Sequence, residues 1–380
     1  YTLPDARNVD VTAVASAATA DQGAIAYTGL SDGVVSEKKL VIFNMGLLTE
    51  FPSPSYLTYQ MRVDSPSQPE KAQWVFVDAN SGDVRFAYPA IHEARNRTTY
   101  NVQSGSNFAA APLLRNETAP PVASATNCSA QDINNAHDYI GQTYDFYWSR
   151  FGRDSYDGLG GPLKSYVCYG ANYQNAFWSF DLQSMVYGKG FTADDVVAHE
   201  LSHAVTQLTS DLNYVGQSGA LNESFSDIMG EALDLTNSSG SDAASVRWDI
   251  GEDVVGFGAI RDLMNPERFG DPDSTISPNY YCGTGDNGGV HTNSGVLNKA
   301  FALMVDGGTF NGQTVSKLGL DLPLRVIYRA NTSYLSSSAR FFDAYQAIIH
   351  SCYDIIGTSD EAGLYCTNIK NALLATRMDA

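Results

Sequence analysis

The stretch VVAHELSHAV, residues 196–205, places two of the six histidines of this chain four positions apart. On an α-helix each residue advances by about 100°, so positions four apart lie on the same face, one turn along. His199 and His203 can therefore hold one cation between their imidazole rings. With Glu200 directly after the first histidine, this spacing is typical of a catalytic zinc site. The alternative is two hydrogen-bonded histidines in the protein core, with no metal.

A catalytic zinc ion usually takes three protein ligands and keeps one position for water, so a third ligand must come from elsewhere. The helical pattern GALNESFSDIMGEALD, residues 219–234, places Glu223 twenty residues after His203 and Asp227 one turn later. We predict that Glu223 is the third ligand. Asp227 then accepts the free N–H of a zinc-bound histidine and fixes its tautomer. A solvated acidic face is the alternative, and the apolar neighbours of these two carboxylates argue against it.

Glu200 follows a ligand directly and points to a neighbouring part of the helix, where it can reach a water on the zinc. Zinc lowers the pKa of such a water toward neutrality, and Glu200 would take its proton during attack on a carbonyl. It would then deliver that proton to the leaving amine. A purely structural zinc is the alternative, but such sites normally close with a fourth protein ligand and would leave Glu200 without a role.

Two longer blocks carry a family resemblance. HELSHAVTQLTSDLNYVGQSGALNESFSD, residues 199–227, and DNGGVHTNSGVLNKA, residues 286–300, resemble the signature blocks of the thermolysin-like zinc metalloendopeptidases, which include vibriolysin and pseudolysin. The likeness runs from about residue 131 to the C-terminus and includes NYQNAFW, MVYG, WDIGED and RFGDPD. It implies an α+β fold with a mixed α/β N-lobe and a mainly helical C-lobe. It also implies a secreted endopeptidase that cuts on the N-terminal side of bulky hydrophobic residues.

The same resemblance assigns roles to matching residues. It makes His291 a donor to the oxyanion, with Tyr214 as its phenolic partner and Asp286 as the residue that orients its ring. It brings Asn175 and the Ala176 carbonyl against the substrate backbone, as an edge strand does when a peptide adds to a sheet. The remaining substrate residues are Arg261, which would receive a substrate carbonyl, and the apolar lining Val196, Ile250, Val254 and Ile260. For each residue alone, ordinary packing is the alternative.

Calcium is the second cofactor that the resemblance implies. The matching acidic positions are Asp195, Asp234, Asp249 and Glu252. Arg247 stands where a family member with two calcium ions has an acid, so we expect one Ca²⁺ in addition to Zn²⁺, with the guanidinium replacing the lost cation. The segment KGFTADD before the zinc helix is shorter than in the family, so the resemblance does not define the rim of the specificity pocket.

The N-terminal part differs in composition from the rest. Residues 1–95 alternate β-forming residues with turns and predict a small antiparallel module, and residues 36–90 resemble the PepSY part of the family's propeptide. Residues 96–130 are rich in Asn, Ser, Ala and Pro, which predicts a linker and the start of the mature enzyme. We expect the catalytic N-lobe with the zinc helix at 131–215 and the helical C-lobe at 216–380.

The presence of the N-terminal module is compatible with more than one processing state of the chain. The segment IHEARNRTTYN contains Arg95 and is the expected place for maturation cleavage of the pro-region. The chain is then a latent zymogen or a processed complex that keeps its own pro-region as a partner. The alternative from another class is a secreted structural or binding protein that uses a protease scaffold and retains the module.

Bulk composition limits partners and location. Acidic residues outnumber basic ones 42 to 23, which gives a formal charge of −19 and argues against nucleic acid as a partner. No apolar run is long enough to span a membrane. The cysteines predict a bridge between Cys352 and Cys366 and a less strongly supported one between Cys128 and Cys168, with Cys282 left over. These cysteines and five glycosylation sequons predict a secreted, extracellular glycoprotein. The sequons lie at Asn96, Asn116, Asn127, Asn237 and Asn331.

Overall fold

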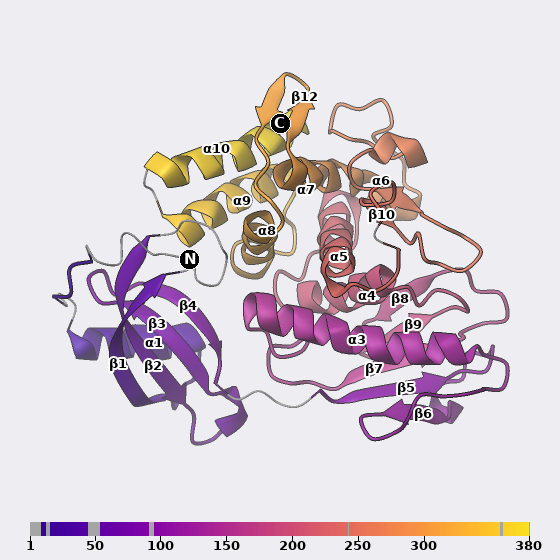
Figure 1. The fold of residues 1–380 in the computed structure, drawn as a ribbon, viewed down its shortest axis with the longest axis horizontal. Helices are drawn as coiled ribbons and strands as arrows, with labels where there is room; N and C mark the ends of the chain where they lie inside the picture. The colour runs from indigo at the N-terminus through magenta and orange to yellow at the C-terminus, as the bar shows by residue number, and fades with distance from the viewer. Residues whose placement is uncertain are drawn as a thin grey trace.

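The computed structural model of the chain describes residues 9–12, 16–44, 54–90, 95–241, 243–357 and 360–379. Three parts are visible in Figure 1: a small β-rich module, a second sheet crossed by a long helix, and a lobe of helices. This arrangement confirms the predicted α+β class, with β-structure concentrated in the N-terminal part and helices in the C-terminal part. None of the described helices combines the length and the apolar character needed to cross a membrane.

The N-terminal module is an antiparallel sheet with one helix against it. The sheet has the order β1-β2-β3-β4, and a hairpin turn at Asn80–Gly82 joins its last two strands. Gly82 has φ +83°, which a side chain would disfavour. Apolar residues of β2 and β3 pack against Ala20 and Ala24 of the helix, which the sequence did not predict. The elements are α1 Ala17–Thr28, β1 Val34–Asn44, β2 Ser55–Asp64, the short helix Pro69–Lys71, β3 Gln73–Asp78 and β4 Val84–Pro89.

The second sheet has the order β6-β5-β7-β9-β8, with three parallel strands between two antiparallel outer ones. Helix α3, Ala130–Phe151, packs against this sheet, and its apolar stripe from Ile133 to Phe151 is buried. Residues 96–130, whose composition predicted a linker, supply two of the strands. The elements are β5 Arg97–Asn101, the short helix Phe108–Ala110, β6 Leu113–Asn116, β7 Leu163–Val167, β8 Ala176–Ser179 and β9 Ser184–Tyr187.

Helix α4, Asp194–Gln207, lies between the second sheet and the helical lobe. The predicted helical character of the C-lobe is present throughout that lobe. Its helices are α5 Gly216–Asn237, α6 Asp286–Asn293, α7 Gly295–Asp306, α8 Asp321–Ser333, α9 Phe341–Ile356 and α10 Asp360–Ala375. Its remaining elements are β10 Asp249–Ile250, β11 Arg261–Asp262, the short helix Pro266–Phe269, β12 Gly308–Phe310 and β13 Gln313–Val315.

The cysteines pair as predicted, Cys128 with Cys168 and Cys352 with Cys366, and Cys282 is exposed and free among the described residues. One sequon is unsuitable for a glycan in the folded chain. Asn331 is 4% exposed and its amide donates to Thr206 Oγ1 at 2.9 Å, so a glycan could not be accommodated there.

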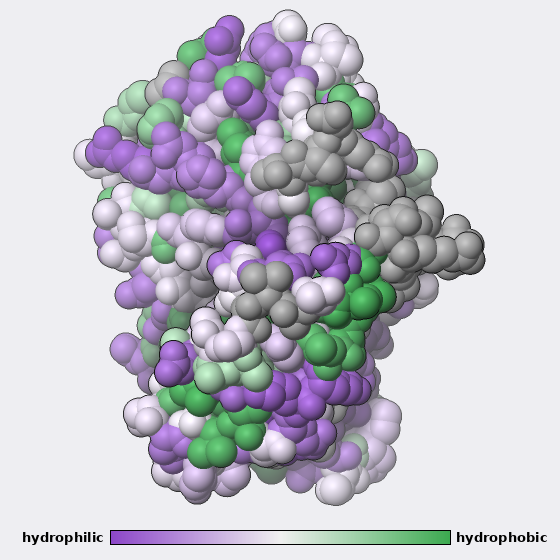
Figure 2. Space-filling view, turned by 90° about the vertical axis from the view of Figure 1, so that its left-hand side faces the viewer, coloured by the Kyte–Doolittle hydropathy of each residue, from purple (hydrophilic) through white to green (hydrophobic). Residues whose placement is uncertain are grey.

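The module docks against the ends of two helices of the catalytic part. Tyr88 of β4 lies so close to Gly152, which ends α3, that a Cβ on this glycine would come within 2.6 Å of the Tyr88 Cβ. The Tyr56 hydroxyl approaches Gly357, which ends α9. Figure 2 views this side of the molecule and shows mostly hydrophilic residues with small, separate hydrophobic patches.

Candidate metal centre and cleft

Helix α4 carries the first two candidate ligands on one face, as the spacing predicted. His199 Nε2 and His203 Nε2 are 2.9 Å apart, and the residues are 6% and 7% exposed. The helix is buried over nearly its whole length, so its polar side chains face protein rather than water. Two imidazole nitrogens this close in a buried site need a shared proton or a shared cation.

Glu223 of α5 completes the group. Its Oε2 lies 3.4 Å from His199 Nε2, and its Oε1 lies 3.5 Å from His203 Nε2. Zinc bonds of about 2.0–2.2 Å in tetrahedral geometry separate neighbouring ligand atoms by about 3.3–3.6 Å, close to these distances. Glu223 Oε2 is buried and has no hydrogen-bond partner among the described residues. Two imidazoles and a carboxylate whose Oε2 has no described hydrogen-bond partner therefore fit a zinc ion with one coordination position left open.

The outer nitrogens of both histidines are also held. His199 Nδ1 lies 2.9 Å from Asp227 Oδ1, the contact expected from the sequence. Asp227 also accepts from Arg261 Nε and Asn298 Nδ2, each at 2.8 Å. Burial alone would raise the pKa of Asp227, but Arg261 and His199 outweigh it and hold the pKa at about 2. A charged Asp227 keeps the His199 proton on Nδ1 and leaves Nε2 free to bind metal.

Sequence reasoning missed the partner of the second histidine. His203 Nδ1 lies 2.7 Å from Asn222 Oδ1 and 3.1 Å from Ser226 Oγ. Asn222 precedes the ligand Glu223 directly and Ser226 follows it by three positions. This helix therefore holds the outer nitrogens of both rings. An amide or hydroxyl at this spacing is too common in helices to single out from sequence alone.

Glu200 faces the cleft beside the metal group. It is 5% exposed, and burial, strengthened by the nearby Glu223 carboxylate and opposed by His199, raises its pKa to about 7. The backbone N–H of Trp178 on β8 donates to it, whereas its Oε2 has no partner among the described residues. A carboxyl group with a pKa near neutrality can both accept and release a proton at neutral pH, as general catalysis requires.

Tyr214 and His291 approach the same point from the helical lobe. The Tyr214 hydroxyl donates to Glu223 and lies 3.2 Å from His291 Nε2. His291 Nδ1 lies 2.5 Å from Asp286 Oδ1, and Asp286 Oδ2 accepts the His291 backbone N–H at 2.9 Å. The intervening Gly288 and Gly289 have φ of +88° and +82°, and this left-handed turn brings Asp286 back onto His291.

The expected substrate residues line a cleft of about 220 Å³ that also contains the metal group. The structure places Asn175, Ala176, Arg261, Val196, Ile250 and Ile260 on its wall. Val254 is the exception, since it is not among the residues that line the cleft. It is 2% exposed, and its side chain lies beside Gly251. The lining residues that sequence reasoning missed are Phe177, Trp178, Phe180 and Phe191.

The expected calcium residues gather near the first turn of α4. Asp195, Asp234 and Asp249 are buried, and burial raises the pKa of Asp195 and that of Glu252 above their ordinary values. No three of these four carboxylates come within 4.8 Å of one another among the described residues. Glu231, which the sequence did not single out, is 1% exposed, and neither of its carboxylate oxygens has a described partner. Burial and the neighbouring acids raise its pKa well above the ordinary value.

The cations of this region are arranged differently from our expectation. Arg247 pairs with Asp306, with Nε 2.9 Å from Oδ2, and does not contact the calcium residues directly. Asp249 instead accepts from Arg268 at 2.6 and 2.9 Å. Arg268 therefore neutralises one of the four expected ligands. The carboxylates left for an ion are those around Asp195, with Glu231 among them.

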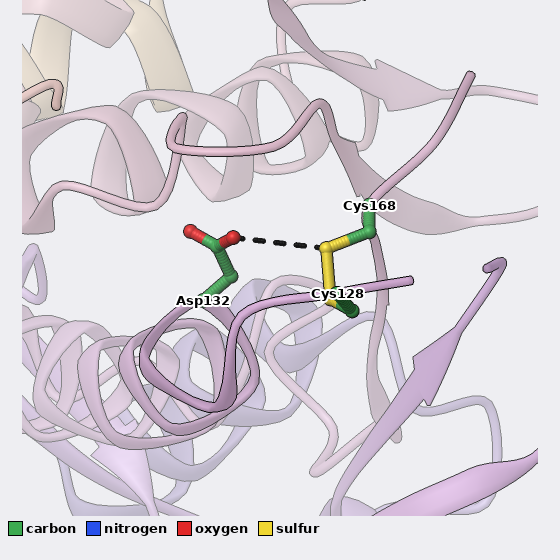
Figure 3. A group of neighbouring side chains, drawn as sticks. All are labelled: Cys128, Asp132 and Cys168. Atoms are coloured by element: carbon green, nitrogen blue, oxygen red, sulfur yellow. Dashed lines mark hydrogen bonds between the residues drawn. A yellow bond between two sulfur atoms is a disulfide. The ribbon is translucent and has the colours of Figure 1, made fainter. Parts of the chain in front are cut away.

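A further cluster holds the short segment before α4. Asp132, in the first turn of α3, points toward the disulfide, with its Oδ2 3.6 Å from Cys168 Sγ (Figure 3). Its Oδ1 accepts from the Gly190 backbone N–H at 3.1 Å and the Thr192 hydroxyl at 3.2 Å. Both sulfurs of this cluster are joined to each other, so it offers no thiolate to a metal ion. Asp132 therefore fixes the start of the zinc helix.

Comparisons with known proteins agree with this geometry. Residues 77–207 match the family described as thermolysin metallopeptidase, catalytic domain, and residues 210–375 match thermolysin metallopeptidase, alpha-helical domain. The chain is 40% identical over 294 residues to bacillolysin from Bacillus cereus, a match that covers 74% of this chain and 47% of that protein. It thus spans about half the length of that relative.

Two further matches cover a larger share of the related protein. Neutral protease NprE from Bacillus pumilus is 39% identical over 275 residues, which is 70% of this chain and 83% of that protein. The solved structure of the precursor of protealysin, a metalloproteinase from Serratia proteamaculans, superposes with a TM-score of 0.60 at 28% identity. That superposition covers 76% of this chain and 89% of the precursor chain.

Proposed function

The chain belongs to the thermolysin metallopeptidase family, and from that premise we propose that it is a secreted, zinc-dependent endopeptidase. The observation that carries the proposal is the convergence of His199, His203 and Glu223, with Glu200 facing the same open cleft. A zinc ion held there would polarise the scissile carbonyl and lower the pKa of a water.

The residues around that ion perform the proton transfers. Glu200 accepts the proton of the attacking water and passes it to the amine that leaves, consistent with its pKa of about 7. The Tyr214 hydroxyl donates to the oxyanion that develops on the carbonyl oxygen. His291, which Asp286 holds through Nδ1, places Nε2 beside the same oxygen as a second hydrogen-bonding group. Asp227 fixes the His199 tautomer and holds Arg261 at the edge of the cleft.

Substrate binding follows from the walls of the cleft. We propose that a peptide adds along β8, where Asn175 and the Ala176 carbonyl meet its backbone, and that Arg261 donates to a substrate carbonyl. Val196, Ile250 and Ile260 form an apolar wall suited to a bulky hydrophobic side chain directly after the scissile bond. We also propose one calcium ion near Asp195 and Glu231, where buried carboxylates otherwise repel one another.

We retain the division into a pro-region at 1–95, a connecting part at 96–130 and catalytic lobes at 131–215 and 216–380 as a proposal. The residues that line the cleft lie between Asn175 and His291, so no described residue of the module lines it. The module docks instead against the ends of α3 and α9. We therefore propose that the module remains a docked partner and does not block the cleft.

The expected cleavage segment IHEARNRTTYN lies partly outside the described residues, since 91–94 are not described. Within its described part, Arg95 pairs with Asp145 on α3, and Arg97, the first residue of β5, pairs with Glu117 at 2.7 Å. A processed chain would thus keep its new N-terminus anchored on α3. Secretion is supported by the two disulfides and by the exposed sequons at Asn96 and Asn127.

The test is hydrolysis of a quenched peptide with Leu or Phe after the scissile bond, for the whole chain and for Glu200→Gln. We expect chelator-sensitive cleavage by the first and none by the second, with one zinc per chain in both by metal analysis. Asp157→Asn, a carboxylate change outside the cleft residues, is the matched control and should cleave normally. Equal inertness of the wild-type chain and Glu200→Gln, with zinc bound, would favour a protein that uses the fold as a binding scaffold.

A further inference from the structure

A continuous row of aromatic rings crosses the second sheet and ends at the cleft. The Tyr100 and Tyr166 rings are 5.1 Å apart, and the Phe108 ring lies 5.0 Å from Tyr166 and 5.6 Å from Tyr169. Tyr169 continues to two more rings at 5.1 and 5.7 Å. We call this set the aromatic row; its members are Tyr100, Phe108, Tyr166, Tyr169, Tyr173 and Phe177.

The strand register places the row on the outer face of the sheet. Tyr100 pairs with Tyr166, and both Tyr166 and Phe177 pair with Val186 on β9, so these residues share one face across four strands. The opposite face carries Thr99, whose hydroxyl lies 3.1 Å from His137 Nδ1 on α3. Val186 is fully buried beneath the rings, whereas all six rings are only partly buried.

The segments that carry the row are firmly held. The Ser104 backbone N–H donates to the Cys168 carbonyl, and Gly170 N–H donates to the Gly105 carbonyl, both at 2.9 Å. These bonds lay the segment with Phe108 across the end of β7. The disulfide from Cys168 to Cys128 ties the same turn to the start of α3 (Figure 3). The rings therefore form a preorganised surface, which costs little to order on binding.

The row is continuous with the proposed substrate site. Phe177 lines the cleft and follows Ala176, whose carbonyl we assign to the substrate backbone. The apolar wall of Val196, Ile250 and Ile260 takes the residue after the scissile bond, so the residues before that bond are left to the β8 side. From β8 to β5 the row crosses three strand spacings, about 14 Å, so a peptide that leaves the β8 edge and turns across the outer face of the sheet covers it with about four extended residues.

Resting on the proposed function, we propose that the aromatic row binds the part of an extended polypeptide substrate that precedes the scissile bond. The ligand class is an unfolded, apolar segment that contains proline or aromatic residues, because flat, half-exposed rings favour such chains. The alternative is that the substrate ends within the cleft. The row would then have only a structural role, which is to cover the buried side chain of Val186.

Two quenched peptides test the proposal: a short one that fills the cleft, and the same peptide extended by five proline- and aromatic-containing residues before the scissile bond. We expect kcat/KM about 10-fold higher for the extended peptide. Tyr166→Ala and Phe108→Ala should each reduce this preference about 3- to 10-fold and leave cleavage of the short peptide unchanged. A third peptide, extended after the scissile bond, should show no such dependence.

Phe342→Ala, which removes an exposed ring on α9, is the matched control and should keep the preference. Equal cleavage of short and extended peptides by the wild type would overturn the proposal. So would a loss of both activities together in the variants, which would mark the row as structural. If no peptide is cleaved, the proposed function fails, and binding of the extended peptide to Glu200→Gln, measured by fluorescence anisotropy, tests the aromatic row separately. Weaker binding when Tyr166→Ala is added supports peptide binding by the row. Equal binding with and without Tyr166→Ala overturns it.

Discussion

Replacing Asp227 with asparagine tests the outer support of the metal group. The carboxylate is fully buried and meets His199, Arg261 and Asn298. Asparagine keeps the shape but removes the charge, so Arg261 stays buried without its counterion and the His199 tautomer is no longer fixed. Breaking a buried ion pair from one side costs about 3–5 kcal/mol. Loss of a carboxylate behind a metal-bound histidine weakens metal binding by about 10- to 100-fold.

We therefore expect Asp227→Asn to raise the zinc dissociation constant about 10- to 100-fold, measured by competition with a chromophoric chelator. Urea unfolding of the zinc-free protein should show a free energy of unfolding lower by about 3 kcal/mol. Asp306→Asn is the control, because that carboxylate also pairs with an arginine, Arg247, but touches no histidine. Its zinc affinity should equal that of the wild type. Unchanged zinc affinity in Asp227→Asn would refute the proposed link between Asp227 and the tautomer of His199.

Three further predictions concern stability. Burial, with nearby arginines, lowers the pKa of His137 from 6.5 to about 4. The stability that the neutral ring provides is therefore present above pH 6.5 and is lost as the pH falls toward 4, and the free energy of unfolding should decrease by roughly 2 kcal/mol. His137→Gln should flatten this pH dependence, measured by urea unfolding. Replacing Cys352 and Cys366 with alanine opens a loop closed at a sequence separation of 14 and should lower the free energy of unfolding by about 3 kcal/mol. Glu231→Gln should raise the melting temperature in a calcium chelator and reduce the increase that calcium produces, because the variant no longer buries a repelled carboxylate.

The long periodic elements of this fold could be predicted from the sequence, and the short ones could not. The stripe of α3 and the helices of the C-lobe repeat their apolar residues over several turns, which makes the period visible. Strands β5 and β6 span five and four residues within a segment rich in polar residues, so composition favoured a linker. Helix α1 was hidden by its small residues, because AATADQGAIAYT has no apolar stripe.

In the candidate site, too, contacts set by spacing along one helix could be predicted, and contacts set by the packing of distant segments could not. His199 and His203 are one helical turn apart, so their spacing alone brings them together. The partners Asn222 and Ser226 depend on how α5 faces α4, which no short pattern encodes. Val254, which was expected in the lining, follows a two-residue strand and a glycine turn, and such short elements give no repeated pattern from which its facing could be predicted. Arg268 likewise reaches Asp249 from nineteen residues further along the chain.

One small residue determines how closely the two ligand-bearing helices approach. Gly230 of α5 lies against α4, and a Cβ at this position would come within 2.7 Å of the Asp195 carbonyl oxygen and 3.6 Å of the His199 Cβ. Any side chain there would have to move α5 away from α4. Glu223 lies two turns earlier on α5, and its 3.4 Å distance to His199 Nε2 leaves little room for such a shift before the three ligands cease to share an ion. The geometry of the metal group therefore depends on backbone contact between two helices as much as on the ligands themselves.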